Sequence, residues 1–392
     1  MPHLMNTYAR LPVTFTAGRG CDLTDTEGRI YLDALAGIAV NTLGHGHPEF
    51  VAALAEQAGR LIHVSNVYGI AEAEALADRL AGISAMSEVF FANSGCEANE
   101  AAIKLARLYG HKREVAQPAI IVMEQAFHGR TLATLSATGN RKVQAGFEPL
   151  VTGFLRVPYC DIAAIRQIAD TNANAVAVLM EPVQGEGGIR AAPAEFMREL
   201  RALCDAKQWL LMFDEVQCGI GRTGRWFAHQ HAGIVPDVMT LAKGLGSGVP
   251  IGACLTAGRA AGLFAPGNHG STFGGNPLAC RAGLATLDIV ESSGLLARAE
   301  SLGARIRDGL SASLAGVPGV REVRGHGLMI GVELDRACAA IVTLALARGL
   351  LVNVTAERVV RLLPPLVMSD AEGDRVVALL CDVVREFLGT AP

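Results

Sequence analysis

The chain has 392 residues, of which 51% are hydrophobic and 18% are charged, as expected for a globular protein with two or three domains and several buried cores. Its net charge of −4 argues against a nucleic-acid or anionic-membrane binder, because such partners repel a negative surface. Nine scattered cysteines without a CxxC pair, no signal-peptide pattern at the start and no apolar run that could span a bilayer together predict a soluble, cytoplasmic protein.

The first 45 or so residues contain short strand patterns at Cys21–Thr24 and Arg29–Asp33, separated by a turn at Asp25–Gly28. These strands are too few to form a core by themselves. We therefore expect residues 1–47 to pack on the C-terminal part of the chain, as the first segment of a small domain.

From Glu88 to about Thr256, short apolar runs rich in β-branched residues alternate with longer helical patterns. This alternation predicts a large α/β domain over residues 48–287, built around a mainly parallel sheet. Apolar spacing predicts helices at Glu97–Tyr109 and Ala194–Ala206. The predicted strands are Val89–Ala92, Ala119–Met123, Ala175–Met180, Leu210–Phe213, Val238–Leu241 and Gly252–Thr256.

After Asn276 the chain becomes predominantly helical, and this change predicts a second domain of α+β type over residues 288–392. The sequence shows neither an internal repeat nor a low-complexity tract. The predicted elements are helices at Leu295–Leu314, Arg336–Arg348 and Ala371–Phe387, with strands at Leu328–Glu333 and Val359–Leu362.

A turn of small residues, Ser94-Gly95-Cys96, joins a predicted strand to a predicted helix in FFANSGCEANEAAIKLAR. Free N–H groups at a helix N-terminus bind anions, and glycine lets a phosphate approach closely. Two interpretations are open at this point, a phosphate site or an ordinary turn in which Ser94 caps the helix.

A second candidate is LLMFDEVQCGIGRTG, where an apolar strand ends in the carboxylates of Asp214 and Glu215. In a parallel α/β sheet the carboxyl end of a strand opens onto the ligand crevice, which favours a functional role for an acid there. Residues 219–224 also fit GxGxxG, which would indicate an NAD-dependent dehydrogenase. That alternative is disfavoured because other residues intervene after the strand and no clear helix begins at Gly224.

Only five of the 34 basic residues are lysines, and Lys243 alone lies in apolar, glycine-rich surroundings, in TLAKGLG. Desolvation there would lower its pKa and favour the neutral, nucleophilic amine. Lys104 follows Glu100 by four residues on a predicted helix, which predicts an ordinary surface pair. Lys112, Lys142 and Lys207 lie in polar contexts.

A phosphate-binding turn, an acid at a strand end and a reactive lysine match the requirements of pyridoxal 5'-phosphate. The sequence also resembles the class III (ω-amino acid) aminotransferases that use this cofactor, and within them the acetylornithine aminotransferases. The resemblance covers essentially the whole chain. It rests on seven ordered motifs, SGCEANEAAIKLAR, FHGRT, EPVQGEGG, FDEVQCGIGRTG, LAKGLGSGVPIGA, HGSTFGGNP and VRLLPPLV.

The resemblance implies a type I pyridoxal-phosphate transferase fold, with a mainly parallel seven-stranded sheet in the large domain. It also implies a homodimer with its active sites at the subunit interface. Lys243 would bind the cofactor covalently and move the proton of the reaction, Asp214 would pair with the pyridinium, and Gln217 would hydrogen-bond the ring hydroxyl.

The resemblance further implies that Phe127 stacks on one face of the ring and that Val216 covers the other. The turn Ser94–Cys96 would hold the phosphate, with backbone N–H groups from Gly95 and Cys96, together with Thr272 of the partner subunit. The family more often has threonine at position 96, so a side-chain hydroxyl contact is not expected from this chain.

For the substrate, the resemblance implies that Arg361 grips the α-carboxylate of glutamate or 2-oxoglutarate. Arg130 would hold the distal carboxylate, and Ser271 would also contact the substrate. Fixed guanidinium forks suit dicarboxylic substrates. Because an ω-amine donor presents a methylene where glutamate presents a carboxylate, Arg361 must be neutralised in one half-reaction, and Glu186 matches the carboxylate that does so.

The implied activity is transfer of the δ-amino group of N2-acetyl-L-ornithine to 2-oxoglutarate, which gives N-acetylglutamate 5-semialdehyde and glutamate in arginine biosynthesis. N-succinylornithine and N-succinyl-diaminopimelate are further candidate donors. Ornithine and 4-aminobutyrate aminotransferases are the alternatives within the family. Ile38 stands where ornithine enzymes tend to carry a tyrosine, which favours an acylated donor. The HxH pairs His45/His47 and His229/His231 lack further ligands at metal-site spacing, so we expect no metal.

Overall fold

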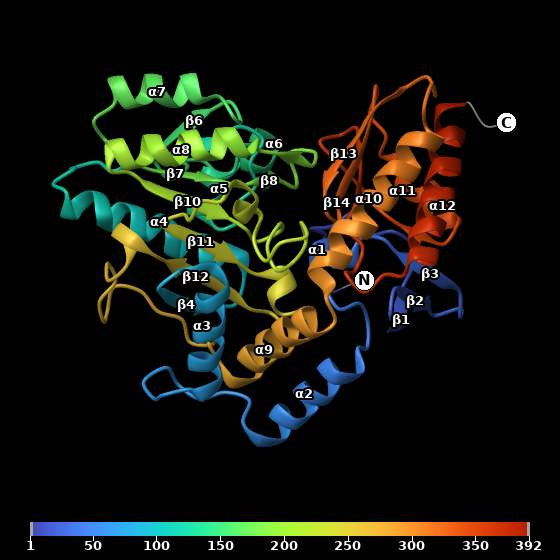
Figure 1. The fold of residues 1–392 in the computed structure, drawn as a ribbon, viewed down its shortest axis with the longest axis horizontal. Coiled ribbons are helices and arrows are strands. Elements are labelled where there is room, and N and C mark those ends of the chain that lie inside the picture. Colours follow the sequence, from blue (N-terminus) through green and yellow to red (C-terminus); the bar gives the residue numbers. More distant parts are fainter. Residues whose placement is uncertain (1–2, 390–392) are drawn as a thin grey trace.

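The computed structural model describes residues 3–389, which form two lobes visible side by side in Figure 1. The larger lobe contains a seven-stranded sheet, and the smaller combines the first strands of the chain with its last quarter. Within residues 3–389 no helix is long and apolar enough to cross a membrane.

The seven-stranded sheet is mainly parallel, as predicted. Only β12 runs against its neighbours, while the other adjacent pairs are parallel. Six of the seven strands fall where the sequence predicted them, and β6, a short edge strand, was missed. The strand order is β4 (Glu88–Ala92), β12 (Gly252–Thr256), β11 (Val238–Leu241), β10 (Leu210–Asp214), β7 (Ala175–Met180), β5 (Ala119–Met123) and β6 (Phe154–Val157).

The central strands are buried along their whole length because helices cover both faces of the sheet. Alternate residues of β5 show this division: Ile120 and Val122 belong to the cluster under α4 (Gly95–Lys112). Ile121 and Met123 belong to the opposite cluster, under α7 (Ile162–Thr171) and α8 (Ala194–Lys207). The remaining helices of this region are α5 (Leu132–Ala137) and α6 (Arg141–Gln144).

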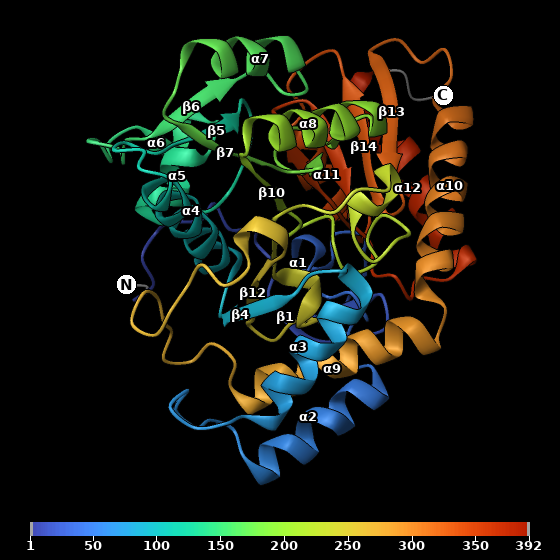
Figure 2. The same ribbon diagram turned by 60° about the vertical axis from the view of Figure 1, so that its left-hand side comes forward.

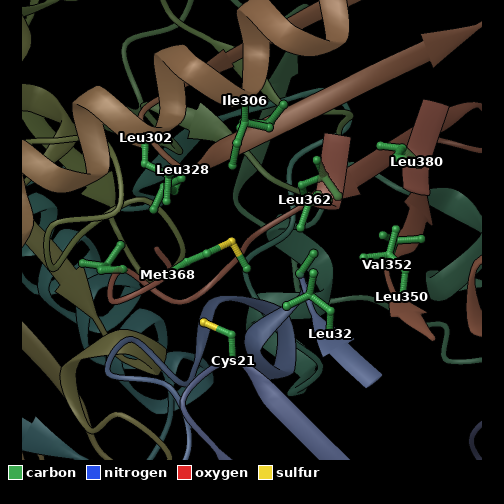
Figure 3. Close-up of a cluster of buried hydrophobic side chains, with 14 of the residues drawn as sticks. Cys21, Leu32, Leu302, Ile306, Leu328, Leu350, Val352, Leu362, Met368 and Leu380 are labelled. Atoms are coloured by element: carbon green, nitrogen blue, oxygen red, sulfur yellow. The ribbon is translucent and has the colours of Figure 1, made fainter. Parts of the chain in front are cut away.

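The smaller lobe joins the two ends of the chain. Strand β3 (Ile30–Asp33) pairs in parallel with β15 (Leu350–Leu351), in the sheet order β1 (Phe15–Arg19), β2 (Asp22–Asp25), β3, β15. Figure 3 shows Cys21 and Leu32 packed among residues of the C-terminal part. That part contains α10 (Leu295–Ser313), β13 (Val320–His326), β14 (Met329–Leu334), α11 (Ala340–Ala347), β16 (Asn353–Thr355), β17 (Val359–Leu362) and α12 (Asp370–Leu388).

Three helices, α2 (Pro48–Arg60), α3 (Ala71–Ser84) and α9 (Pro277–Ser292), lie together at the bottom of Figures 1 and 2. Before them, α1 (Ala36–Ala39) has positive φ angles at all its residues, so it is a left-handed turn. The other short elements are β8 (Val183–Gln184), β9 (Arg190–Ala191), η1 (Ala228–Ala232), η2 (Lys243–Leu245) and η3 (Gly258–Ala260).

Candidate active site

Segments that follow the carboxyl ends of β4, β5, β7, β10 and β11 converge on one cavity of about 340 Å³. Since the strands are parallel, these ends meet at one edge of the sheet, where ligands bind in open α/β folds. Eight predicted site residues line this cavity, namely Ser94, Gly95, Cys96, Phe127, Asp214, Val216, Gln217 and Lys243.

Asp214, the last residue of β10, is almost completely buried at the cavity wall. Its Oδ2 accepts hydrogen bonds from Asn99 Nδ2 and His128 Nδ1, each at 2.8 Å, and its Oδ1 accepts the Val216 N–H at 3.0 Å. Thr240 donates to Asn99 Oδ1 at 2.7 Å and so orients the Asn99 amide. These donors fix the orientation of the buried Asp214 carboxyl group at the cavity wall.

Lys243 begins the short helix η2 directly after β11, with its backbone in the left-handed region (φ 44°). Burial lowers the pKa of its amine below the ordinary value, and the positive charge of Arg361 acts in the same direction. Lys243 therefore has the increased neutral fraction that a nucleophile or base requires.

The N-terminus of α4 faces the same cavity. Ser94 is the N-cap and accepts the Glu97 N–H at 3.2 Å, while Gly95 and Cys96 supply the first N–H groups of the helix. Cys96 Sγ also accepts the Arg130 N–H at 3.2 Å, which holds the segment after β5 against this helix. Ser94 therefore caps the helix, and the free N–H groups beside it suit an anion.

Arg361, on β17 of the smaller lobe, is buried to 1% exposure, and its guanidinium points toward the large lobe. Its Nη1 donates to Glu186 Oε1 at 2.6 Å and to Gln217 Oε1 at 3.3 Å, and its Nε donates to Asn353 Oδ1 at 3.1 Å. Burial raises the pKa of Glu186, but the charge and hydrogen bond of Arg361, together with Lys243 and Gln217, outweigh burial and hold the pKa below its ordinary value. Thr355 fixes the Glu186 backbone by donating to its carbonyl.

A second cavity of about 780 Å³ adjoins the first, and Phe127 lines both. Arg130 and Glu186 also line it. The Arg130 guanidinium lies 5.7 Å from the centre of the Phe127 ring, and among residues 3–389 it has no acidic partner. It therefore remains available for an anionic ligand.

Two predicted residues lie elsewhere in the single chain. Ser271 and Thr272 line a separate hollow of about 510 Å³ beside α4, and neither lines the cavity that contains Lys243. Asn93 lies between the Lys243 cavity and this hollow, because it lines both and donates to Ser271 Oγ at 3.2 Å.

The GxGxxG residues 219–224 form a turn that packs against the smaller lobe and does not open a helix. A Cβ at Gly221 would lie 3.0 Å from Leu366, and one at Gly224 would lie 3.0 Å from Glu300. The glycines therefore permit close packing of the turn, as the motif's sequence context indicated.

The family model for class-III aminotransferases matches residues 4–384. This chain is a class-III aminotransferase. It is 60% identical to acetylornithine aminotransferase 1 of Bordetella parapertussis, over 98% of each chain, and 58% identical to the acetylornithine aminotransferase of Nitrosomonas europaea, over 99% of each.

Solved structures agree with this assignment. The N-acetylornithine aminotransferase of Stenotrophomonas maltophilia is 35% identical, with a TM-score of 0.85 over 97% of this chain and 98% of that one. The ornithine aminotransferase of Toxoplasma gondii is 34% identical, with a TM-score of 0.94 over 99% and 93%. The class-III aminotransferase described here therefore has the predicted α/β transferase fold.

Three buried residues of this class-III aminotransferase were not predicted from the sequence, namely Asn99, His128 and Glu181, although all line the first cavity. His128 and Glu181 lie within the motifs FHGRT and EPVQGEGG, so their position beside predicted residues was the available signal. Burial raises the pKa of Glu181 to about 7, and the neighbouring His128 ring opposes that shift.

Proposed function

We propose that this class-III aminotransferase transfers the δ-amino group of N2-acetyl-L-ornithine to 2-oxoglutarate, with pyridoxal 5'-phosphate as cofactor, in arginine biosynthesis. The names of the relatives at 60% and 58% identity support this substrate. The observation that carries the proposal is the pair of buried Arg361 with half-buried Glu186, at 2.6 Å, which Gln217 connects to the cavity that contains Lys243. Such a pair suits an enzyme that must accept a dicarboxylate in one half-reaction only.

The residues present fit the cofactor. The cavity combines a buried carboxylate (Asp214) for the ring nitrogen, the N–H groups of Gly95 and Cys96 for the phosphate, and the Lys243 amine for the aldehyde. Phe127 and Val216 provide apolar walls for the two faces of the ring. When bound, pyridoxal 5'-phosphate supplies an aldehyde that carries the amino group and a ring that withdraws electrons from the reacting carbon.

Lys243 holds the cofactor and acts as the base that moves the proton from the δ-carbon of the donor. Its lowered pKa supports this role, because a base must be neutral before it can accept a proton. Asp214 would pair with the ring nitrogen, and Asn99 and His128 hold the Asp214 side chain in position for that contact. Gln217 would hydrogen-bond the ring hydroxyl.

Arg130 and Arg361 bind the substrate carboxylates. With N-acetylornithine, Arg130 holds the single carboxylate while Glu186 neutralises Arg361. With 2-oxoglutarate, the α-carboxylate replaces Glu186 on Arg361, and the exposed side of Glu186, whose side chain is 38% accessible, leaves room for it to turn away. Charge neutrality around Arg361 is thus kept in both half-reactions.

We also propose that the enzyme is a cytoplasmic homodimer in which Ser271 and Thr272 of one subunit complete the site of the other. Their position in a hollow apart from Lys243 supports a role in a neighbouring site. Nine free cysteines support a reducing compartment. Within each subunit we propose a large domain over residues 48–287 and a small domain formed by residues 1–47 and 288–392.

A steady-state panel tests the substrate. With 2-oxoglutarate as acceptor, we expect the highest kcat/KM for N-acetylornithine among N-acetylornithine, N-succinylornithine, N-succinyl-diaminopimelate, ornithine and 4-aminobutyrate. Ile38 packs with the apolar cluster of Ile189 and Leu363. Its side chain offers no polar group to the free α-amino group of ornithine. A higher kcat/KM for ornithine or 4-aminobutyrate would contradict the proposal.

A further inference from the structure

Glu181, directly after β7, connects two segments that approach the cavity from different parts of the chain. Its Oε1 accepts the N–H of Phe127 at 2.9 Å, and its Oε2 accepts the N–H of Gly185 at 3.2 Å. The side chain is 5% exposed and lines the same cavity as Lys243. Each carboxylate oxygen therefore holds the backbone of one segment.

The first segment follows β5 and carries both Phe127 and Arg130, whose guanidinium lies over the Phe127 ring. The second segment carries Glu186, whose side chain pairs with Arg361 and whose backbone carbonyl accepts a hydrogen bond from Thr355 on β16, the strand paired with β17 of Arg361. The backbone contact remains when the Glu186 side chain turns away from Arg361. Gly185 in that segment is packed so closely on Gln217 that a Cβ there would lie 2.1 Å from Gln217 Oε1. Displacement of Gly185 would consequently disturb the contact between Gln217 and Arg361 as well.

We propose that Glu181 is a positioning residue, which fixes the spacing of the two substrate arginines by tying the Phe127–Arg130 segment to the Gly185–Glu186 segment. The roles of Arg130 and Arg361 in this statement rest on the proposed function. A dicarboxylate must engage both guanidinium groups at once, so its binding depends on that spacing. N-acetylornithine engages only Arg130, so its binding depends less on the spacing of the two arginines.

The test compares the Glu181→Gln holoenzyme with the wild type, by amide hydrogen exchange and by steady-state kinetics. Glutamine keeps the size of the side chain but offers one acceptor oxygen, and its NH2 group faces the other N–H. At about pH 8.5, where Glu181 is ionised in the wild type, we expect exchange about tenfold faster in the segments containing Phe127 and Gly185. The KM for 2-oxoglutarate should rise about tenfold, more than the KM for N-acetylornithine, with kcat changed less than about threefold.

Glu124→Gln is the matched control, because Glu124 is an exposed carboxylate on the same segment as Phe127. It should leave exchange and KM unchanged. Glu181→Asp keeps the charge but is one methylene too short to reach both N–H groups, and it should give the same pattern in a weaker form.

Unchanged exchange at either segment in folded Glu181→Gln protein would overturn the proposal. Exchange that accelerates throughout the sheet in both Glu181 variants would also overturn it, because Glu181 would then support the fold in general. If N-acetylornithine is not a substrate, the exchange data still report whether Glu181 joins the segments, and the KM for the acceptor is measured with the best donor of the panel.

Discussion

Glu186 is the residue whose charge decides which ligand Arg361 accepts. In Glu186→Gln the guanidinium would lose its anionic partner and keep the weaker contacts with Gln217 and Asn353. We expect the half-reaction with N-acetylornithine to slow about tenfold, and the KM for 2-oxoglutarate to fall, because the incoming carboxylate no longer displaces a competitor. Rapid-mixing absorbance measurements of each half-reaction separate the two effects.

Glu199→Gln is a suitable control for this change, since Glu199 pairs with Arg166 on the surface and lines neither of the two cavities of the site. It should leave both half-reactions as they are in the wild type. Equal slowing of both half-reactions by Glu186→Gln would contradict the switch.

His128 supports Asp214 at the wall of the cavity. In His128→Phe the ring remains but its N–H donor is lost, so Asp214 Oδ2 keeps only the Asn99 amide as a side-chain donor. We expect the dissociation constant for pyridoxal 5'-phosphate to rise at least about tenfold, because a hydrogen bond to a buried charge is worth about 1.5–3 kcal/mol. Equilibrium dialysis measures this dissociation constant. The control variant His111→Phe, changed at an exposed histidine, should bind pyridoxal 5'-phosphate as tightly as the wild type.

The sequence predicts the functional groups at strand ends better than the groups that support them. Lys243 and Asp214 stand out because apolar strands precede them. The donors to Asp214 come from residues 86 and 115 positions away, so only the folded sheet shows that His128 and Asn99 meet it. The predicted surface pair of Lys104 with Glu100 is wrong for a related reason, because Lys104 instead reaches the Asn268 carbonyl and the His269 ring.

At the scale of single elements, α12 closes the core of the smaller lobe and has a complete N-terminal cap. Ser369 accepts the Glu372 N–H and Glu372 accepts the Ser369 N–H, a capping box. Ser369→Ala should lower the free energy of unfolding by about 1 kcal/mol, as measured by urea unfolding. Ser301→Ala, in the exposed interior of α10, should not destabilise the protein, because alanine is the better helix former there. Equal effects of the two variants would argue against the cap.

The elements that the sequence predicted lie within about four residues of their observed bounds, but several others were not predicted, among them α2, α7 and β6. Strand β6 contains Arg156 at its centre and lies at the sheet edge, so its pattern is short and partly polar. The predicted helix Arg336–Arg348 begins only at Ala340. The left-handed turn at α1 was not predicted, because three of its four residues are not glycine. Its start is held locally, by hydrogen bonds from the N–H groups of Leu35 and Ala36 to the Asp33 side chain.

At the scale of the whole molecule, the chain ends share one core, and this arrangement places Arg361 beside the large lobe. Leu32 lies opposite Leu350 in the parallel pair of β3 with β15, and both are fully buried. The sequence indicated that the first strands need another part of the chain to cover them. It could not indicate which strand they join, because a two-residue strand such as β15 has no periodicity to recognise.

The proposed assembly can be tested by mixing two inactive variants. Lys243→Ala removes the reactive amine, and Thr272→Arg places a large side chain where one subunit would complete the site of the other. If the sites are shared, a mixed dimer has one site with its own Lys243 and with Thr272 from the partner. Random exchange of subunits should then restore about a quarter of the wild-type site concentration, whereas each variant alone stays inactive. Subunit exchange confirmed by mass spectrometry without any recovered activity would show that Thr272 serves only its own chain.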